Sequence, residues 1–181
     1  MPQSIALFLI LLIQFVLLAA MLFMIHWHFV AFTSVPWVRT PRWKTKRMLA
    51  LAGLKPGERM LDVGSGDGST AIDAARDFGA FGHGIEMQWS LYWFSKLRAR
   101  FLGLSTKATF TRGSMFRERL PDADVVFCYL FPELNEKLEP ILKNRYPAGT
   151  RVVSRTFSFP GLREIGRERI GSETVFLYKI D

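Results

Sequence analysis

The sequence predicts an α/β fold, a largely parallel sheet with helices on both faces, preceded by one transmembrane helix. Three observations carry this prediction. After residue 57, short apolar runs typical of strands alternate with segments typical of helices, the order expected of βαβ units. A turn with three glycines follows the first of these runs. An almost unbroken apolar stretch fills residues 5–25.

The apolar stretch predicts a membrane anchor. At ~1.5 Å per residue, a helix of this length reaches about 30 Å, the thickness of a bilayer core, and Gln14 is its one strongly polar side chain. A secretory signal peptide would begin with basic residues and be shorter, whereas this chain begins Met1-Pro2-Gln3-Ser4. A buried core helix of this length would have a polar face.

Charge predicts the orientation of the anchor. The N-terminal side carries no Lys or Arg, and a basic cluster follows the helix, made of Arg39, Arg42, Lys44, Lys46 and Arg47. The positive-inside rule then places the N-terminus outside and the following domain in the cytoplasm. We divide the chain into an anchor (1–30), a basic juxtamembrane linker (31–43) that the prolines keep extended, and a domain (44–181).

The helices and strands of the domain are predicted from the spacing of apolar residues and from the glycines and prolines that end helices. Gly53 ends the first helix, the glycine turn opens the second, and Pro140 predicts a kink or break in the last. We expect helices over 44–52, 69–78, 88–102 and 133–145, and strands over 59–63, 81–86, 109–112, 124–129, 151–155 and 174–180. The aromatic residues from Trp89 to Phe94 do not share one helical face, so core packing is favoured over a substrate cage.

The glycine turn predicts an adenosine cofactor. In the run 61–68, Gly64, Gly66 and Gly68 leave room for a ligand to approach the backbone closely. Glu86, at the end of the next apolar run, is placed to accept hydrogen bonds from both ribose hydroxyls. The carboxyl ends of parallel strands meet at one rim, so Ser114 and Tyr129 are expected there as well.

Spacing identifies the cofactor. A dinucleotide fingerprint needs its third glycine at position 69, which is Ser69, and no Gly-Lys-Ser or Gly-Lys-Thr of a phosphate loop follows. A turn of this spacing, with Asp62 at the strand end, suits S-adenosylmethionine (SAM), a cationic cofactor without phosphate. Asp67 has an alternative reading as a cap of the following helix.

Charge and composition indicate which kinds of partner this chain binds. The net charge of +8 is explained in part by the juxtamembrane cluster, and no RNA-binding motif accompanies the remaining scattered arginines. We therefore expect a membrane partner and no nucleic acid. The single cysteine, Cys128, lies in an apolar run and is expected to be a small core residue. No His and Cys spacing indicates a metal site.

Together these residues resemble the class I SAM-dependent methyltransferases, which have a Rossmann-like seven-stranded sheet with an antiparallel final strand. The resemblance covers about residues 44–181. It implies that Asp62, Gly64, Ser65, Gly66, Asp67, Gly68 and Glu86 bind the cofactor, and that Ser114 and Met115 lie in the loop beside adenine. That loop usually offers Asp where this chain has Ser114, whose neutral hydrogen bond contributes only about 1 kcal/mol.

A narrower resemblance involves several short segments. The chain resembles a small family of membrane-anchored lysine methyltransferases that act on the adenine nucleotide translocase or the ATP synthase c-subunit. The similar segments are the anchor, 36–41, 48–52, 64–68, 84–86, 129–132 and 152–154. This resemblance implies a lysine substrate in a membrane-associated protein. Leu162 stands where the family tends to have Trp.

Tyr129 and Glu133, past the fourth strand, are the candidate catalytic residues. Lysine must lose its proton before methyl transfer, and Glu133 can take it directly or through water. The alternatives are a sheet-end aromatic for Tyr129 and a first-turn acid favoured by the helix dipole for Glu133. Other acceptors remain open: a lipid or isoprenoid headgroup first, then RNA. A binding module without catalysis is the remaining alternative.

Overall fold

The computed structural model describes residues 2–33, 37–117 and 119–181, and the side chains of residues 4–25, 37–117 and 119–181. The chain forms two compact units, Met1–Trp37 and Val38–Asp181. Residues 34–36 of the expected linker lie outside the described residues, and so do the side chains of residues 26–33.

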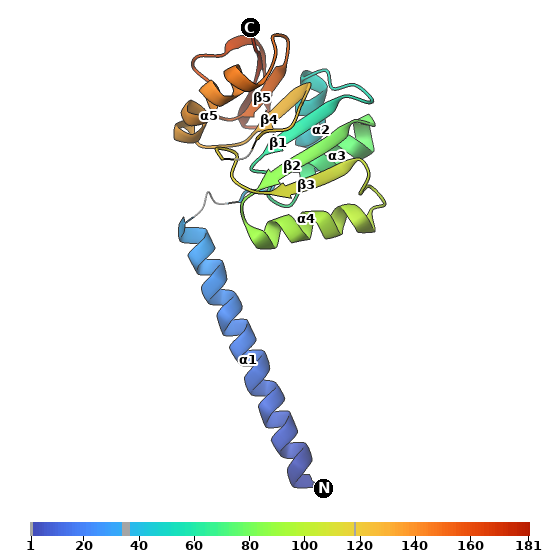
Figure 1. Cartoon of the computed structure of the whole chain (residues 1–181), viewed down its shortest axis with the longest axis vertical. Coiled ribbons are helices and arrows are strands. Elements are labelled where there is room, and N and C mark those ends of the chain that lie inside the picture. The colour runs from blue at the N-terminus through green and yellow to red at the C-terminus, as the bar shows by residue number, and fades with distance from the viewer. Residues whose placement is uncertain (1, 34–36, 118) are drawn as a thin grey trace. The chain divides into compact units, whose positions relative to one another are not determined.

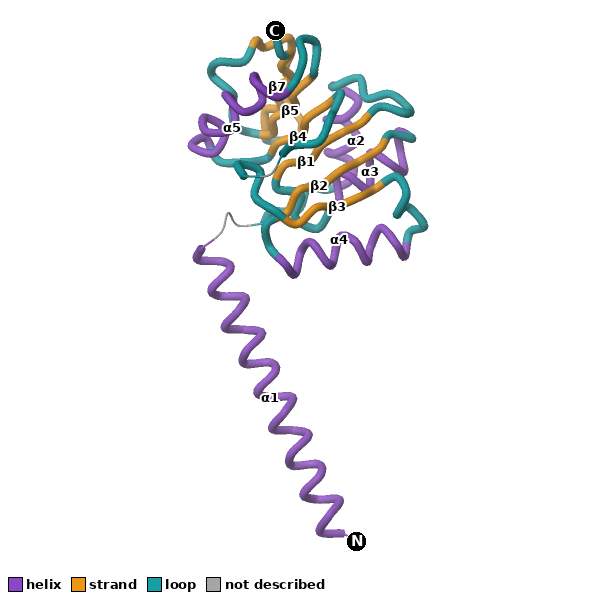
Figure 2. Tube along the Cα trace, viewed as in Figure 1, coloured by secondary structure: helices purple, strands orange, loops and turns teal. Residues whose placement is uncertain are grey.

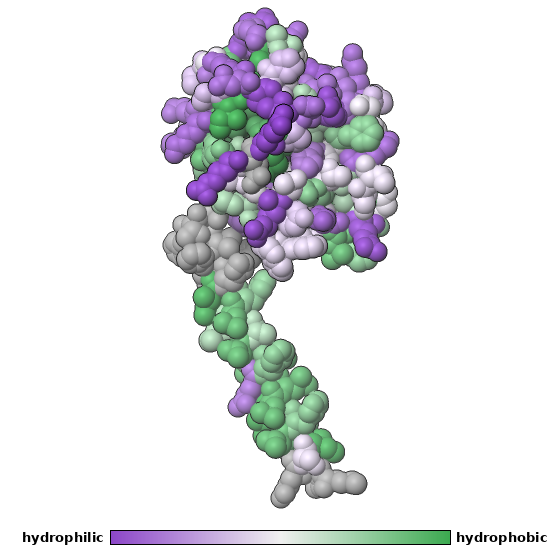
Figure 3. Space-filling view, viewed as in Figure 1, coloured by the Kyte–Doolittle hydropathy of each residue, from purple (hydrophilic) through white to green (hydrophobic). Residues whose placement is uncertain are grey.

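The first unit contains the helix α1 (Pro2–Thr33), coloured blue in Figure 1. Every side chain from Ser4 to Ile25 is exposed, and nearly all of them are apolar. The face of the helix seen in Figure 3 is mostly green, the colour of hydrophobic residues. This 22-residue segment is long and apolar enough to cross a membrane by length and composition. A helix that is apolar all round lacks the polar face of a surface helix.

In the second unit, seven strands form one sheet among the described residues (Figure 2). In chain order they are β1 (Arg59–Val63), β2 (Phe81–Glu86), β3 (Ala108–Arg112), β4 (Val125–Cys128), β5 (Arg151–Arg155), β6 (Arg163–Ile170) and β7 (Glu173–Lys179). Their spatial order is β3-β2-β1-β4-β5-β7-β6. The first five run parallel, and β7 is antiparallel to both β5 and β6. The predicted fold class, including the antiparallel final strand, is confirmed.

Alternation along the central strands divides the core between the two faces of the sheet. On β1, Met60 packs into one hydrophobic cluster and Leu61 and Val63 into the other. Helices α2 (Arg42–Leu51), α3 (Ser69–Phe78) and α4 (Trp89–Phe101) belong to the Met60 face, and α5 (Pro132–Arg145) to the opposite face. Strand β4 is buried along its whole length, as expected for a central parallel strand, and Cys128 is a buried core residue there.

Two expectations about the elements are corrected. Helix α5 continues through Pro140, so of the kink or break expected there the break is excluded. Pro140 is exposed, so water can satisfy the carbonyl that loses its N–H donor. Strand β6 was not expected, because its sequence Arg-Glu-Ile-Gly-Arg-Glu-Arg-Ile lacks apolar alternation, and only Ile170 in it is buried. An exposed edge strand needs one partner, here β7, and little apolar burial.

The aromatic segment of α4 is a third correction. The structure buries Leu91, Ser95 and Ala99, while Trp89, Trp93 and Phe94 are about half exposed or more. These aromatic side chains therefore do not pack in the core.

Candidate functional site

The glycine turn connects β1 to α3 and is fastened to the neighbouring strand. The backbone N–H groups of Gly64 and Ser65 both donate to the carbonyl of Ile85 on β2, at 3.0 Å. Gly64, Gly66 and Gly68 all have left-handed φ angles, of 77°, 54° and 72°. Only glycine adopts this conformation readily, so the turn depends on all three.

Space around the turn is as restricted as its backbone. A Cβ on Gly64 would lie 3.2 Å from the Leu130 side chain, and one on Gly68 would lie 2.6 Å from Phe110 and from Ser95. The missing Cβ of Gly64 therefore lets Leu130 pack close to the turn, while Gly68 lets α3 start against β3 and α4.

Glu86 binds the turn from the end of β2. Its side chain is buried, and its two carboxylate oxygens accept hydrogen bonds from the N–H groups of Gly66 (2.8 Å) and Gln88 (2.7 Å). Burial raises the pKa of Glu86, and the N–H groups of Gln88, Gly66 and Met87 act in the opposite direction. A carboxylate accepts about four hydrogen bonds, so beside these N–H groups Glu86 keeps capacity to accept from a ribose hydroxyl.

Asp62 lies below the turn on β1. Burial raises the pKa of this carboxyl to about 8, the Thr70 hydroxyl opposes the shift, and the nearby Glu86 and Asp67 add to it. Ser65, in the turn, has a buried hydroxyl that lies against Gly84 of β2 and has no hydrogen-bond partner among the described residues. An unpartnered buried hydroxyl, a turn whose three glycines carry no Cβ and a carboxylate with free lone pairs fit an adenosine cofactor.

Asp67 is occupied by protein contacts. One carboxylate oxygen accepts from the N–H (3.1 Å) and the hydroxyl (2.6 Å) of Ser69, the first residue of α3. The other oxygen pairs with Arg98 at 2.8 Å and with Arg39 at 3.4 Å. Asp67 lies one residue before the N-cap, Gly68, and its contacts hold the first residue of α3 and tie α4 to the glycine turn.

The loop after β3 closes over the same turn. The N–H of Gly113 donates to the carbonyl of Glu86 at 3.0 Å, which joins this loop to the end of β2. Ser114 is half-buried, and its hydroxyl accepts from the N–H of Phe116 at 3.3 Å. The Met115 methyl group lies 3.7 Å from the position of a Cβ on Gly64. Ser114 and Met115 thus lie at the rim where the cofactor is expected.

The candidate catalytic residues occupy different environments. Tyr129 is half-buried just past β4, with the Arg155 guanidinium 4.0 Å from its ring centroid. Glu133 is exposed in the first turn of α5, where the helix dipole favours an acid.

Sequence reasoning missed several buried polar side chains, among them Arg155, whose guanidinium lies over the Tyr129 ring. Arg155 is buried and donates to both carboxylate oxygens of Glu173 at 2.8 Å and to the Thr40 hydroxyl at 2.8 Å. The next residue, Thr156, has a left-handed φ of 70°, and its buried hydroxyl has no described partner. The amide oxygen of Asn135 is likewise buried and unpartnered. These groups come from distant segments, and no local motif links them.

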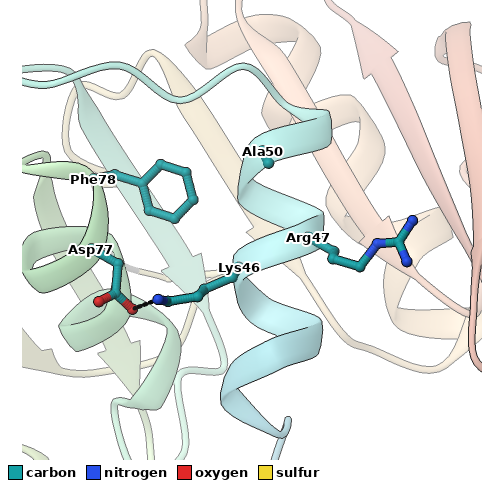
Figure 4. Close-up of a pocket in the computed structure, with 5 residues that line it drawn as sticks. All are labelled: Lys46, Arg47, Ala50, Asp77 and Phe78. Atoms are coloured by element: carbon teal, nitrogen blue, oxygen red, sulfur yellow. Dashed lines mark ion pairs between the residues drawn. The ribbon is translucent and has the colours of Figure 1, made fainter.

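A cavity of about 350 Å³ on the α2–α3 surface is not part of this site. Figure 4 shows its lining, in which Lys46 of α2 reaches Asp77 of α3 at 3.5 Å. Asp77 and Phe78 are the last residues of α3, whereas the glycine turn precedes the first. The cavity therefore lies at the end of α3 away from the turn.

Comparisons with known sequences find related proteins over most of the second unit. The family model described as the ANTKMT methyltransferase domain matches residues 62–165. A protein-lysine N-methyltransferase of Saccharolobus islandicus is 32% identical over 151 residues, which cover 81% of this chain and 94% of that protein. The adenine nucleotide translocase lysine N-methyltransferase of Mus musculus is 29% identical over 81% of this chain and 64% of the mouse protein.

A solved structure is similar over the same region. The crystal structure of an RNA methyltransferase from Salinibacter ruber, in complex with S-adenosyl-L-homocysteine, is 36% identical, with a TM-score of 0.76. The alignment covers 79% of this chain and 94% of that one.

Proposed function

This chain belongs to the ANTKMT methyltransferase domain family, and on that premise we propose that it is a membrane-anchored enzyme that methylates a lysine of a membrane-associated protein. The family membership makes it a SAM-dependent protein-lysine methyltransferase. The membrane anchoring is proposed from the apolar segment Ser4–Ile25. This segment precedes the catalytic domain in the same chain and is long and apolar enough to cross a bilayer.

The residues for the cofactor are proposed from the site. Glu86 holds the ribose, and the turn of Gly64, Ser65, Gly66 and Gly68 receives the methionine part, which its left-handed, Cβ-free backbone lets approach closely. Asp62 faces the positive charge of the cofactor, Asp67 fixes the turn, and Ser114 and Met115 border adenine. When bound, SAM supplies a methyl group on a sulfonium, activated for in-line transfer.

The protein's remaining tasks are to orient the lysine amine, exclude water and remove its proton. We propose Tyr129 as the residue that positions the amine, because it lies at the strand end next to the turn. Glu133 is proposed as the proton acceptor, acting through water, since its carboxylate is solvent-exposed. A methyl acceptor beside the cationic sulfonium loses its proton more readily than in solution.

The anchor organises the proposed enzyme in the cell. We propose residues 1–30 as the anchor, 31–43 as the linker and 44–181 as the catalytic domain, with the N-terminus outside and the domain in the cytoplasm. The basic residues that follow α1 support this orientation. A tether raises the local concentration of a membrane substrate and replaces a large docking surface.

Labelling of membranes tests the acceptor. The full-length protein is incubated with membranes of a strain lacking its gene and with methyl-labelled SAM. We expect the label in methyl-lysine after protein hydrolysis, and a Glu86→Ala variant to give none. Label found only in lipid would favour the lipid or isoprenoid acceptor. Label found only in RNA would favour RNA as the acceptor, as in the name of the Salinibacter protein. The affinity of this protein for RNA would then fall steeply as the salt concentration rises.

Two matched variants test the proton acceptor. Glu133 and Glu136 are both exposed residues of α5, but only Glu133 lies in its first turn. We expect Glu133→Gln to reduce kcat by about 100-fold or more and to change its pH profile, and Glu136→Gln to change neither. Equal effects of the two substitutions would assign Glu133 a structural role.

Labelling with a membrane-impermeant thiol reagent tests the orientation. Cys128 is fully buried and does not compete for the reagent in the folded protein. A Ser4→Cys variant is expected to react in intact cells, and a Glu136→Cys variant only after the membrane is opened. The reverse pattern would reject the proposed orientation.

A further inference from the structure

Helix α4 carries an apolar face that no part of the second unit covers. The side chains of Trp89, Trp93, Phe94, Leu97 and Phe101 are exposed, with Phe101 82% accessible. They are spaced mainly four residues apart, so they form a stripe along the helix. We call these five residues the α4 outer face.

The geometry of the helix sets this face directly away from the core. At about 100° per residue, the α4 outer face is centred about 160° from the arc of Leu91, Ser95 and Ala99, the residues that α4 buries. In Figure 3, pale and green surface interspersed with purple lies over α4. Exposed apolar side chains in a continuous stripe, unlike scattered ones, mark an interaction surface.

The charge beside this face is of one sign. Helix α4 contains Lys96, Arg98 and Arg100 and no acidic residue. The Lys96 ammonium lies 5.2 Å from the ring centroid of Trp93 and 5.3 Å from that of Tyr92. Arg98 is engaged with Asp67, which leaves Lys96 and Arg100 exposed next to the aromatic side chains.

We propose that the α4 outer face docks on the surface of an anionic phospholipid bilayer. Tryptophan, phenylalanine and leucine bordered by cations are the composition of helices that lie in the membrane interface. Tryptophan rings favour the headgroup level, and lysine and arginine attract anionic lipids. A second copy of this chain is a poorer occupant, because a symmetric contact would bring like charges together.

Docking in this way would position the cofactor site. Glu86 lies three residues before Trp89, and the intervening Met87 is 57% exposed. The end of β2 and the start of α4 would therefore both lie close to the headgroups. A lysine that a folded membrane protein exposes at the level of the headgroups could then reach the rim of the site, and the substrate would not need to unfold. This inference rests on the proposed membrane function, because the anchor keeps the domain near the bilayer.

Spin labels at three positions test the docking. The full-length protein, in vesicles of 70% phosphatidylcholine and 30% phosphatidylglycerol, carries one label at a time, through Phe101→Cys, Glu136→Cys or Leu17→Cys. Accessibility to oxygen is compared with accessibility to a water-soluble nickel complex. We expect the label at position 101 to favour oxygen about 10-fold more than the label at 136 does, and the label at 17 to lie in the bilayer.

The labels separate failure of the docking from failure of the anchor. A label at 101 as accessible to nickel as that at 136, with the label at 17 in the bilayer, would reject docking and keep the anchor. A label at 17 in water with the label at 101 in lipid would reject the anchor and keep docking. Dipolar coupling between labels at 101 on two molecules would reject bilayer docking and show that the α4 outer face binds a second copy of this chain.

Activity provides a second readout. A Trp93→Glu/Phe101→Glu variant is expected to slow methylation of vesicle-embedded acceptors about 10-fold, with unchanged SAM affinity and melting temperature. The matched control is Ile165→Glu, because Ile165 is an exposed apolar residue on β6. Equal rates for the two variants would overturn the proposal.

Discussion

The Arg155 guanidinium lies 4.0 Å from the ring centroid of Tyr129, so a buried cation covers one face of the candidate substrate-positioning residue. The contact is within the range of a cation–π interaction. Arg155 is itself held by Glu173 and Thr40. Tyr129 is therefore oriented by residues on β5, β7 and the segment before α2, and its hydroxyl can be tested separately from its ring.

Substitution of Tyr129 by Phe should affect turnover and leave folding unchanged. The ring under Arg155 is preserved in this variant, and only the hydroxyl proposed to position the amine is lost. We expect kcat to fall about 10-fold, with unchanged SAM affinity and melting temperature. Steady-state kinetics and calorimetry check this. A fall in stability without loss of kcat would make Tyr129 a packing residue.

The pair of Arg155 and Glu173 should stabilise the fold in a pH-dependent way. The hydrogen bond from Arg155, aided by Lys44, lowers the pKa of Glu173 to about 2 from its ordinary 4.5. A depressed pKa gives stability that is present above pH 4.5 and lost as the pH falls towards 2. Glu173→Gln should therefore cost about 2 kcal/mol at pH 7, allowing for solvent screening, and less at pH 3.

Denaturant unfolding of the full-length protein in detergent measures this difference. The control is Glu164→Gln, which removes a surface ion pair with Arg167 and should change the free energy of unfolding by less than about 1 kcal/mol. A loss at pH 7 that persisted unchanged at pH 3 would contradict the assignment to Glu173.

Much of the sheet was predicted from the sequence, because its central strands are short, largely buried runs and a glycine turn follows β1. The bounds of β1, β2 and β5 and of α3 agree with the expected ones. Strand β6 could not be predicted, since an exposed edge strand needs no apolar pattern.

The site could be predicted only in part. The glycine turn and Glu86 interact within one βαβ unit, which a local motif reveals. Arg155 contacts Thr40, 115 residues away, and only the folded chain brings them together. The α4 outer face was misread for a related reason, because periodicity shows that aromatic residues share a region but not which side packs.

Substitution of Gly68 by alanine should destabilise the fold more than the same substitution at Gly57, another glycine with a left-handed φ. Gly68→Ala places a Cβ 2.6 Å from Phe110 and Ser95, whereas Gly57 has open space around it at a similar φ of 81°. Both substitutions incur the left-handed penalty of about 1 kcal/mol. We expect Gly68→Ala to cost about 2 kcal/mol more from overpacking. Thermal unfolding measures the difference, and equal losses would show that the neighbours of Gly68 yield.

Asp62 should make stability fall with rising pH. Its folded pKa of about 8 exceeds the ordinary 3.8, so between these values the folded state keeps a proton that the unfolded state has lost. Asp62→Asn removes this effect, and relative to the wild type the variant should gain stability as the pH rises from 4 to 8, by up to about 5 kcal/mol. At pH 4 the two should be similar. Unfolding curves at both pH values test this, and a constant difference would contradict it.

The same carboxyl should couple cofactor binding to proton release. Below pH 8 burial keeps Asp62 protonated, and the cationic sulfonium and amino group of SAM favour its ionised form. Binding at pH 7 should therefore release up to one proton, and SAM affinity should rise as the pH approaches 8, by at most about 10-fold per pH unit. Calorimetry in buffers of different ionisation enthalpy measures the proton. Asp62→Asn serves as the control, because it cannot release one. Proton release of equal size in both proteins would assign it to another group and remove Asp62 from the proposed cofactor site.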